Sequence, residues 1–279
     1  MPATPAKPRL IARPPAFVSH SAGLDTDYFV YAETCGEARD AARGGDNETP
    51  PLPVVVVVDG DYMFEPLVAA AKNLRRENAL PVPAALLVGI GYGKSFGDPR
   101  NRRGRDYTTS AASEEPESGG AGDFFKHLTG PLWAELGRRY PLRDDARVIA
   151  GHSLGGLFAL HALFQPEPFF NAAIVGAPSL WWNGGRYFDQ LAQFRKTRAA
   201  LPALASPSTR LFLGIGEDDT ESMTGDFARL ERQLAAAPFG GLEVVARKYA
   251  GHDHYNLLPV LFRDGLRNAL RFCDCQGGR

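Results

Sequence analysis

Apolar residues along this chain gather in short continuous runs, rich in valine, leucine and isoleucine, that end in glycine or aspartate. Continuous runs predict strands buried on both faces, as in a parallel sheet that is covered by helices. A partly alternating pattern at residues 27–34 predicts one further strand near the N-terminus. The continuous runs cover residues 53–60, 84–91, 147–151, 171–177, 210–216 and 242–247.

Helical patterns lie between these runs. Together they predict an α/β domain with a mostly parallel central sheet and helices on both faces. We expect this single domain to span residues 25–272, after an extended, proline-rich N-terminal segment at 1–24 and before a C-terminal tail at 273–279. The expected helices cover residues 66–76, 123–139, 154–164, 227–236 and 257–272, with Asp123 placed to cap the second.

The motif Gly-x-Ser-x-Gly occurs twice, with Ser95 and Ser153 at its centre. It supports catalysis where a strand enters a sharp turn that opens a helix, because the turn lifts the serine oxygen above the sheet. Ser153 has a predicted strand before it and a predicted helix after it. Ser95 runs into Asp98 and Pro99, which exclude an immediate helix, and its segment lacks the glycine spacing of a phosphate loop. We therefore predict that Ser153 is a nucleophile.

A serine nucleophile needs a base that takes its proton and an acid that orients the base. In α/β hydrolases the acid and then the histidine follow the serine along the chain. His252 and His254 both follow the last predicted strand, and the acidic run at 217–219 follows the strand before it. Position alone leaves both histidines and all three carboxylates open.

Two backbone N–H groups should stabilise the oxyanion that forms during acyl transfer. Leu154, which follows the nucleophile at the start of a predicted helix, is the first by its position. The second should come from the loop after the strand that ends at Asp59. We favour the N–H of Asp61, with Gly60 and Tyr62 as alternatives.

The chain resembles the putative-esterase family of α/β hydrolases, which includes esterase D, the siderophore hydrolases of the enterobactin-esterase type and the antigen-85 mycolyltransferases. The resemblance spans about residues 25–272 and is closest to the siderophore-esterase branch. It rests on segments that occur in the family's order: Asp-Gly-Asp at 59–61, Arg-Asp-Tyr-Thr at 105–108, Gly-His-Ser-Leu-Gly-Gly at 151–156, Ala-Pro-Ser-Leu-Trp-Trp at 177–182, Gly-Glu-Asp-Asp at 216–219 and Gly-His-Asp-His at 251–254.

The resemblance also implies roles for individual residues. Family members carry the catalytic histidine at the end of a Gly-x-(Asp/Asn)-His pattern, which corresponds to His254 here. The family's acid follows a glycine by three residues, which corresponds to Asp219 and leaves Asp218 as the alternative acid. The resemblance thus implies a triad of Ser153, His254 and Asp219.

The loop at 99–105 contains four arginines and follows a strand whose carboxyl end should face the active site. Guanidinium groups hold carboxylate, phosphate or catecholate oxygens, and tryptophans stack on flat aromatic groups. In the alternative interpretation, the basic loop pairs with the acidic stretch at 114–117 and the tryptophans pack in the core. The candidate substrate-binding residues are Tyr62, Arg102, Arg103, Trp181 and Trp182.

Composition narrows the classes of protein. The 279 residues are 44% hydrophobic and 23% charged, with a net charge of −1, which favours a globular protein without a nucleic-acid partner. No apolar run approaches the ~20 residues that span a bilayer, so we expect no membrane partner. Cys35, Cys273 and Cys275 lack the spacing of a metal site, and the N-terminus has no apolar signal core. We therefore expect a cytoplasmic protein with no metal and no cofactor.

These patterns predict a serine esterase. We expect it to hydrolyse a small-molecule carboxylic ester, anionic or aromatic in the manner of a siderophore, through an acyl-enzyme. Three alternatives stay open: an acyltransferase, an S-acyl thioester hydrolase and a non-catalytic binding protein of the same fold. The sequence leaves the oligomeric state open.

Overall fold

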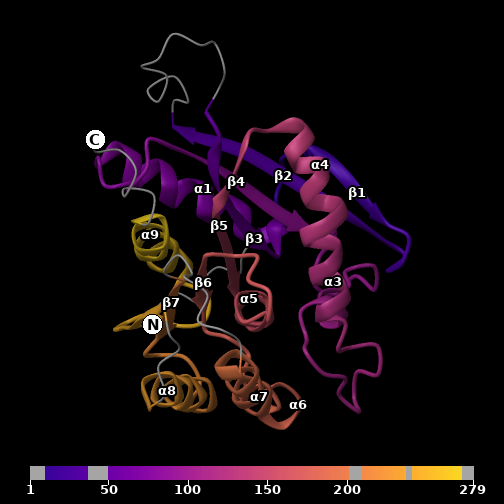
Figure 1. Ribbon diagram of the computed structural model, residues 1–279, viewed down its shortest axis with the longest axis vertical. Helices are drawn as coiled ribbons and strands as arrows, with labels where there is room; N and C mark the ends of the chain where they lie inside the picture. Colours follow the sequence, from indigo (N-terminus) through magenta and orange to yellow (C-terminus); the bar gives the residue numbers. More distant parts are fainter. Residues whose placement is uncertain (1–9, 37–49, 201–208, 237–240, 272–279) are drawn as a thin grey trace, which may run out of the picture.

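The computed structural model describes residues 10–36, 50–200, 209–236 and 241–271. Within these ranges the chain forms one eight-stranded sheet with helices on both faces (Figure 1). The spatial order of the strands is β1-β2-β4-β3-β5-β6-β7-β8. The strands are Phe17–Ser21 (β1), Thr26–Gly36 (β2), Leu52–Val58 (β3), Ala84–Gly91 (β4), Leu142–His152 (β5), Ala172–Gly176 (β6), Thr209–Gly216 (β7) and Leu242–Tyr249 (β8).

The sheet is parallel from β4 through β8, while β2 runs antiparallel to both β1 and β4. β3, β4 and β6 are buried at every position, because helices cover both of their faces. This burial is what their continuous apolar runs predict. The expected α/β fold with a mostly parallel sheet is confirmed.

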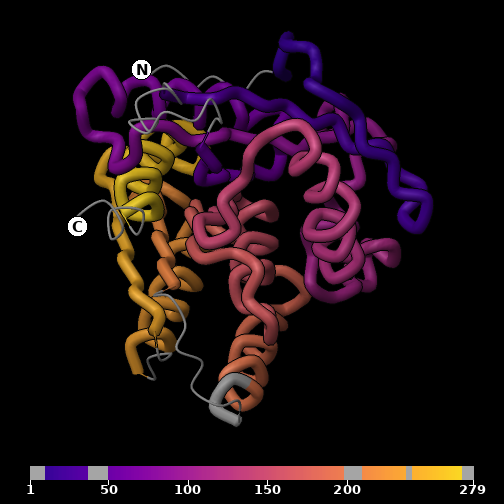
Figure 2. The backbone as a smooth tube through the Cα atoms, turned by 45° about the horizontal axis from the view of Figure 1, so that its top comes forward, coloured from indigo at the N-terminus to yellow at the C-terminus, as the bar shows by residue number. Residues whose placement is uncertain are grey.

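The helices form a layer on each side of the sheet. α1 and α9 pack against each other on one face, and α3, α4 and α5 lie on the other (Figures 1 and 2). A π-helical turn at Leu128–Leu132 joins α3 to α4. The helices are Gly60–Arg76 (α1), Arg103–Asp106 (α2), Ala121–His127 (α3), Trp133–Arg139 (α4), Leu154–Leu163 (α5), Trp182–Gly185 (α6), Tyr187–Ala200 (α7), Glu221–Ala236 (α8) and Leu258–Ala269 (α9).

Several element boundaries differ from the sequence prediction. The segment expected to be extended, 1–24, contains β1, which pairs with β2, so the sheet already includes Phe17. α1 begins at Gly60 and includes Pro66, at which the helix was predicted to start. The α3 helix is preceded by Gly120 at its N-cap, so the expected cap by Asp123 is wrong and Asp123 lies in the first turn. The tail at 273–279 lies outside the described residues.

The strand order places the candidate chemistry at one edge of the sheet. Asp59 follows β3, Ser153 follows β5, the acidic run at 217–219 follows β7, and the histidine segment at 250–254 follows β8. These four strands are parallel, and the carboxyl ends of parallel strands meet at one edge. The fold thereby brings together residues that lie far apart in the sequence.

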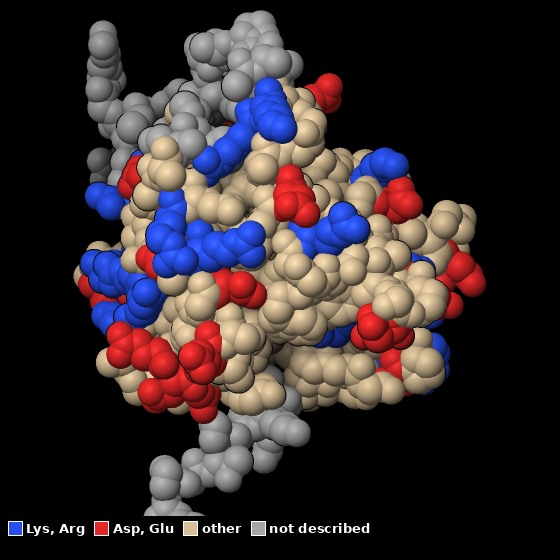
Figure 3. Space-filling view, turned by 90° about the horizontal axis from the view of Figure 1, so that it is seen from below, with Lys and Arg blue, Asp and Glu red and all other residues tan. Residues whose placement is uncertain are grey.

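The charged surface and the helices add two further observations. On the face drawn in Figure 3, basic and acidic side chains occur in small groups beside one another, in keeping with the net charge of −1. Among the described residues, none of the helices has the length and apolar character that crossing a membrane requires.

Candidate active site

Ser153 occupies a sharp turn between β5 and α5. The helix begins at the next residue, Leu154, so strand, turn and helix follow one another without a linker. Ser153 has φ 59° and ψ −122°, a strained conformation that is uncommon outside glycine and recurs at active sites. Its N–H donates to the carbonyl of Gly176 in β6 (3.0 Å), and its carbonyl accepts from the N–H of Leu157 in α5 (3.1 Å). A neighbouring strand and the helix therefore hold the turn in place.

The two glycines of this motif lie where backbones come very close. A Cβ on Gly151 would lie 2.0 Å from the carbonyl oxygen of Gly155. A Cβ on Gly155 would lie 2.9 Å from a side-chain carbon of Val58 in β3. Because real Cβ atoms do not approach other atoms so closely, larger residues would push α5 away from the sheet.

His254 and Asp219 come together from the loops that follow β8 and β7. Nδ1 of His254 lies 2.8 Å from a carboxylate oxygen of Asp219, within hydrogen-bond distance. The Asp219 side chain is only 2% exposed, while that of His254 is 25% exposed and faces the cavity beside Ser153. A buried carboxylate on Nδ1 leaves Nε2 as the nitrogen that is free to exchange protons.

The neighbouring candidates occupy different positions. Asp218 and Glu217 are exposed, and the N–H of Asp218 donates to the carbonyl of His252 (3.0 Å). His252 turns its own Nδ1 to the carbonyl of Ala250 (2.9 Å). The structure thus brings His254 together with Asp219, and it places Asp218 and His252 beside that pair.

Ser153 and His254 line one cavity of about 190 Å³. His152 packs against His254 there, with 4.4 Å between the two ring centroids. Burial lowers the pKa of His152 well below its usual range, and the nearby His254 and Arg103 lower it further. His152 is therefore neutral and adds no positive charge next to His254. The remaining wall is mostly apolar and aromatic: Met63, Phe96, Tyr255 and Leu258, with Arg103.

The two expected oxyanion donors lie at the starts of two helices. Leu154 opens α5 and Asp61 lies in the first turn of α1, where backbone N–H groups have no partner within the helix. These helices follow β5 and β3, which are adjacent strands. The positive ends of two helix dipoles therefore converge near Ser153.

The side chain of Asp61 has a separate structural task. Its carboxylate accepts hydrogen bonds from the Tyr31 hydroxyl (2.8 Å) and from the N–H groups of Tyr92 (2.6 Å) and Gly93 (2.9 Å). Burial raises the pKa of Asp61 above the usual carboxyl range, although these hydrogen bonds oppose the shift. Asp61 thereby fixes the first residues of the loop that follows β4.

Arg103 lines the cavity, but its guanidinium is held by a buried carboxylate. Its Nε and Nη2 atoms both donate to Asp59 at 2.9 Å, and the Asp59 side chain is 1% exposed. The guanidinium also lies 4.6 Å from the ring centroid of Phe96. Burial opposes the positive charge, yet the pairing with Asp59 keeps the pKa of Arg103 above its ordinary value. The expectation that Arg103 is mainly a substrate ligand is therefore wrong, because this side chain already has a protein partner.

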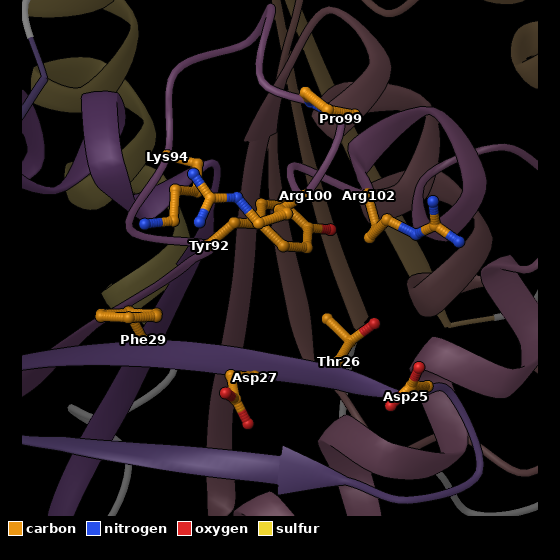
Figure 4. Close-up of a pocket in the computed structure, with 9 residues that line it drawn as sticks. All are labelled: Asp25, Thr26, Asp27, Phe29, Tyr92, Lys94, Pro99, Arg100 and Arg102. Atoms are coloured by element: carbon orange, nitrogen blue, oxygen red, sulfur yellow. The ribbon is translucent and has the colours of Figure 1, made fainter.

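The substrate-binding role expected for Arg102 is also wrong. α2 starts at Arg103, and Arg102 points to the other side of the loop, where it pairs with Glu117 (3.1 Å). This is the interpretation in which the basic loop binds the acidic stretch. Arg102 lines a different cavity, of about 500 Å³, between this loop and the β1–β2 hairpin (Figure 4). The lining of that cavity includes Lys94, Arg100 and Arg102 from the loop and Asp25, Thr26 and Asp27 from the hairpin.

The aromatic candidates divide in a similar way. Trp182 is 6% exposed, and its indole N–H donates to the carbonyl of Ser110 (2.9 Å), so its expected substrate contact is wrong. Trp181 is 48% exposed but is not among the residues that line the Ser153 cavity. Tyr62 packs its ring 4.0 Å from that of Phe96, and supports the cavity wall from behind.

Ser179 is a neighbour of the nucleophile that the sequence analysis did not single out. Its hydroxyl oxygen lies 3.2 Å from that of Ser153, and its N–H donates to the Ser153 carbonyl (3.1 Å). The residue is 1% exposed. Its only signal was membership of the 177–182 segment. Phe96 and Tyr255 gave even less, because their places in the wall depend on how loops pack.

A family model described as "Putative esterase" matches residues 45–256. Among curated relatives, the ferri-bacillibactin esterase BesA of Bacillus subtilis is 31% identical over 80% of this chain and 81% of its own. The siderophore triacetylfusarinine C esterase of Aspergillus fumigatus is 35% identical over 53% of this chain and 51% of its own.

Solved structures share the fold. A BES protein from Bacillus cereus superposes with a TM-score of 0.77 at 24% identity, covering 95% of this chain and 98% of its own. The siderophore hydrolase EstB from Aspergillus nidulans gives a TM-score of 0.74 at 22% identity, covering 94% and 97%. The sheet order and these neighbours together identify an α/β-hydrolase fold.

Proposed function

The chain belongs to the putative-esterase family of carboxylic ester hydrolases, and we propose that it cleaves its ester through an acyl-enzyme on Ser153. The observation that carries this proposal is one cavity lined by both Ser153 and His254, with Asp219 on the Nδ1 side of that histidine. A nucleophile, a base and a buried acid in this order are the parts that acyl transfer needs.

In the proposed reaction, Nε2 of His254 takes the Ser153 proton while the serine oxygen attacks the ester carbonyl. Asp219 holds the imidazole in the required tautomer and stabilises its positive charge. The N–H groups of Leu154 and Asp61 stabilise the oxyanion, and His254 then gives its proton to the leaving alcohol. Water repeats the sequence with the acyl-enzyme and releases the acid.

We propose siderophore esters as the substrate class. The relatives named above are a ferri-bacillibactin esterase and a triacetylfusarinine C esterase, and the first matches most of both chains. The aromatic wall formed by Phe96 and Tyr255 suits a flat or bulky acyl group. The chain would accept such esters as small-molecule partners without a cofactor, because the proposed chemistry uses side chains and backbone alone.

A matched substrate panel tests this assignment. We would measure kcat/KM for ferric and iron-free bacillibactin, enterobactin and triacetylfusarinine C, for p-nitrophenyl butyrate and for an S-acyl glutathione thioester. We expect at least about tenfold higher kcat/KM for one siderophore than for the simple ester, since extra contacts are used in the transition state. A preference for the thioester or for the simple ester would refute the siderophore assignment. A lack of hydrolysis and of fluorophosphonate labelling at Ser153 would refute the acyl-enzyme itself.

A further inference from the structure

The turn that offers the second oxyanion donor begins at an aspartate in an unusual environment. Asp59 is 2% exposed and has the left-handed conformation φ 55°, ψ 36°, which aspartate tolerates better than most residues. Its carbonyl accepts from the N–H groups of Tyr62 (2.8 Å) and Met63 (2.9 Å), which close the first turn of α1. Its own N–H donates to the hydroxyl of Tyr107 (3.0 Å). The conformation of Asp59 therefore sets the direction in which the Asp61 N–H points.

The Asp59 carboxylate also lies between the starts of two helices. It precedes α1, and one of its oxygens lies 3.2 Å from the position that a Cβ on Gly155 would take, in the first turn of α5. The positive ends of both helix dipoles favour an anion at this place. An uncompensated carboxylate here would occupy the field that the oxyanion of the reaction needs.

Arg103 supplies the compensating charge. Its fork of two hydrogen bonds fixes both oxygens of Asp59, and its guanidinium is held between the ring of Phe96 (4.6 Å) and that of Tyr107 (5.9 Å). Arginine suits this position because its planar fork matches a carboxylate and its charge persists on burial. The pair presents nearly no net charge to the helix ends.

We propose that Arg103 is a positioning residue for the oxyanion site, acting through Asp59. It holds the 59–61 turn in its left-handed conformation and cancels the carboxylate charge that would otherwise oppose the oxyanion. This inference rests on the proposed acyl-enzyme function. It differs from a substrate-binding role, because its effect falls on the transition state and leaves the binding of the substrate nearly unchanged.

The test compares four variants: Arg103→Met, Arg103→Lys, Asp59→Asn and the double variant Asp59→Asn/Arg103→Met. Arg102→Met is the matched control, because it removes the adjacent arginine of the same loop, which faces a different cavity. For each we would measure kcat and KM on one neutral ester, the Ki of a trifluoromethyl ketone that forms an oxyanion on Ser153, and the melting temperature.

Arg103→Met should lower kcat by roughly 10²- to 10³-fold with KM within about threefold, since losing one oxyanion donor has an effect of this size. The Ki of the ketone should rise by a similar factor. Arg103→Lys should lose less, because it keeps the charge but not the fork. The double variant should recover at least about tenfold over Arg103→Met, because it removes the uncompensated charge. Arg102→Met should stay within about twofold.

Three results would overturn the proposal: an effect of Arg103→Met confined to KM, an unchanged Ki of the ketone, or a double variant no more active than Arg103→Met. If Arg103→Met does not fold, the double variant and Arg103→Lys still decide, since neither leaves an unpaired buried carboxylate. Fluorophosphonate labelling of wild-type Ser153 separates the two proposals. Without labelling the acyl-enzyme fails, whereas labelling together with any of the three results removes only the role of Arg103.

Discussion

The chain carries the same five-residue pattern twice, and the two copies have opposite surroundings. Around Ser153, the flanking glycines sit where an added Cβ would collide with backbone or with Val58. Around Ser95, the chain turns through an exposed loop, and a Cβ on Gly97 would meet nothing within 4 Å. A glycine–serine motif therefore carries information only when packing requires its glycines. The pattern alone does not distinguish a nucleophile from a surface loop.

The largest expected difference between the two copies is in catalysis. Ser153→Ala should lower kcat by roughly 10⁶-fold, as removal of a triad nucleophile does, while Ser95→Ala should stay within a few fold. Steady-state hydrolysis of a chromogenic ester measures both. Comparable losses, or covalent labelling of Ser95 by a fluorophosphonate, would break the comparison.

The support behind Ser153 is the next difference, because Ser95 lies on an exposed loop outside the Ser153–His254 cavity. Asp219→Asn should lower kcat by about 10⁴-fold, since the amide favours the wrong tautomer of the histidine that it contacts. Asp218→Asn should cost only a few fold, because that side chain is exposed. His254→Ala and His252→Ala provide the parallel pair, with the large loss expected for His254. A greater loss in Asp218→Asn than in Asp219→Asn would contradict this arrangement.

A smaller effect is expected on stability. Gly151→Ala should lower the free energy of unfolding by about 3 kcal/mol, because its Cβ would lie 2.0 Å from the carbonyl oxygen of Gly155. Gly97→Ala should change it by less than about 0.5 kcal/mol, as surface substitutions usually do. Urea unfolding at neutral pH measures both values. An equally tolerated Gly151→Ala would show that the turn has room to relax.

The helix behind Ser153 should also make the fold sensitive to acid. Burial lowers the pKa of His161 in α5 to about 4. An unfolded histidine has a pKa near 6.5, so between about pH 6.5 and pH 4 the unfolded chain binds more protons, and stability falls as the pH falls. At pH 5 this amounts to about 2 kcal/mol relative to pH 7.5. Urea unfolding of His161→Gln should show a correspondingly smaller loss between these pH values, and an identical loss would contradict the assignment.

Local context was enough to predict most of the fold. β3, β4 and β6 are fully buried, and their continuous apolar runs predicted them. β1 was missed because it has only five residues and follows a proline-rich stretch. α7 was missed because its buried residues, such as Tyr187 and Leu191, lie only near its start and give no periodic pattern. β8 was predicted as buried but is half exposed, because it forms the edge of the sheet.

The site divides along the same line. The position of Ser153 follows from its neighbours in the sequence, and the approach of His254 to Asp219 follows from strand order. The partner of Arg103 does not, because Asp59 lies 44 residues earlier and only the folded loop brings them together. Guanidinium groups in sequence alone give no sign of whether they face a ligand, another loop or a buried carboxylate.

One turn of the chain, residues 59–61, clamps the loop after β4 at both ends. Asp61 holds the N–H groups of Tyr92 and Gly93, and Asp59 holds Arg103. The stretch between these anchors, residues 94–102, can therefore be exchanged as a cassette without disturbing the catalytic scaffold. Evolution, or an engineer grafting loops, has at this place a site where substrate range can diversify while the chemistry stays fixed.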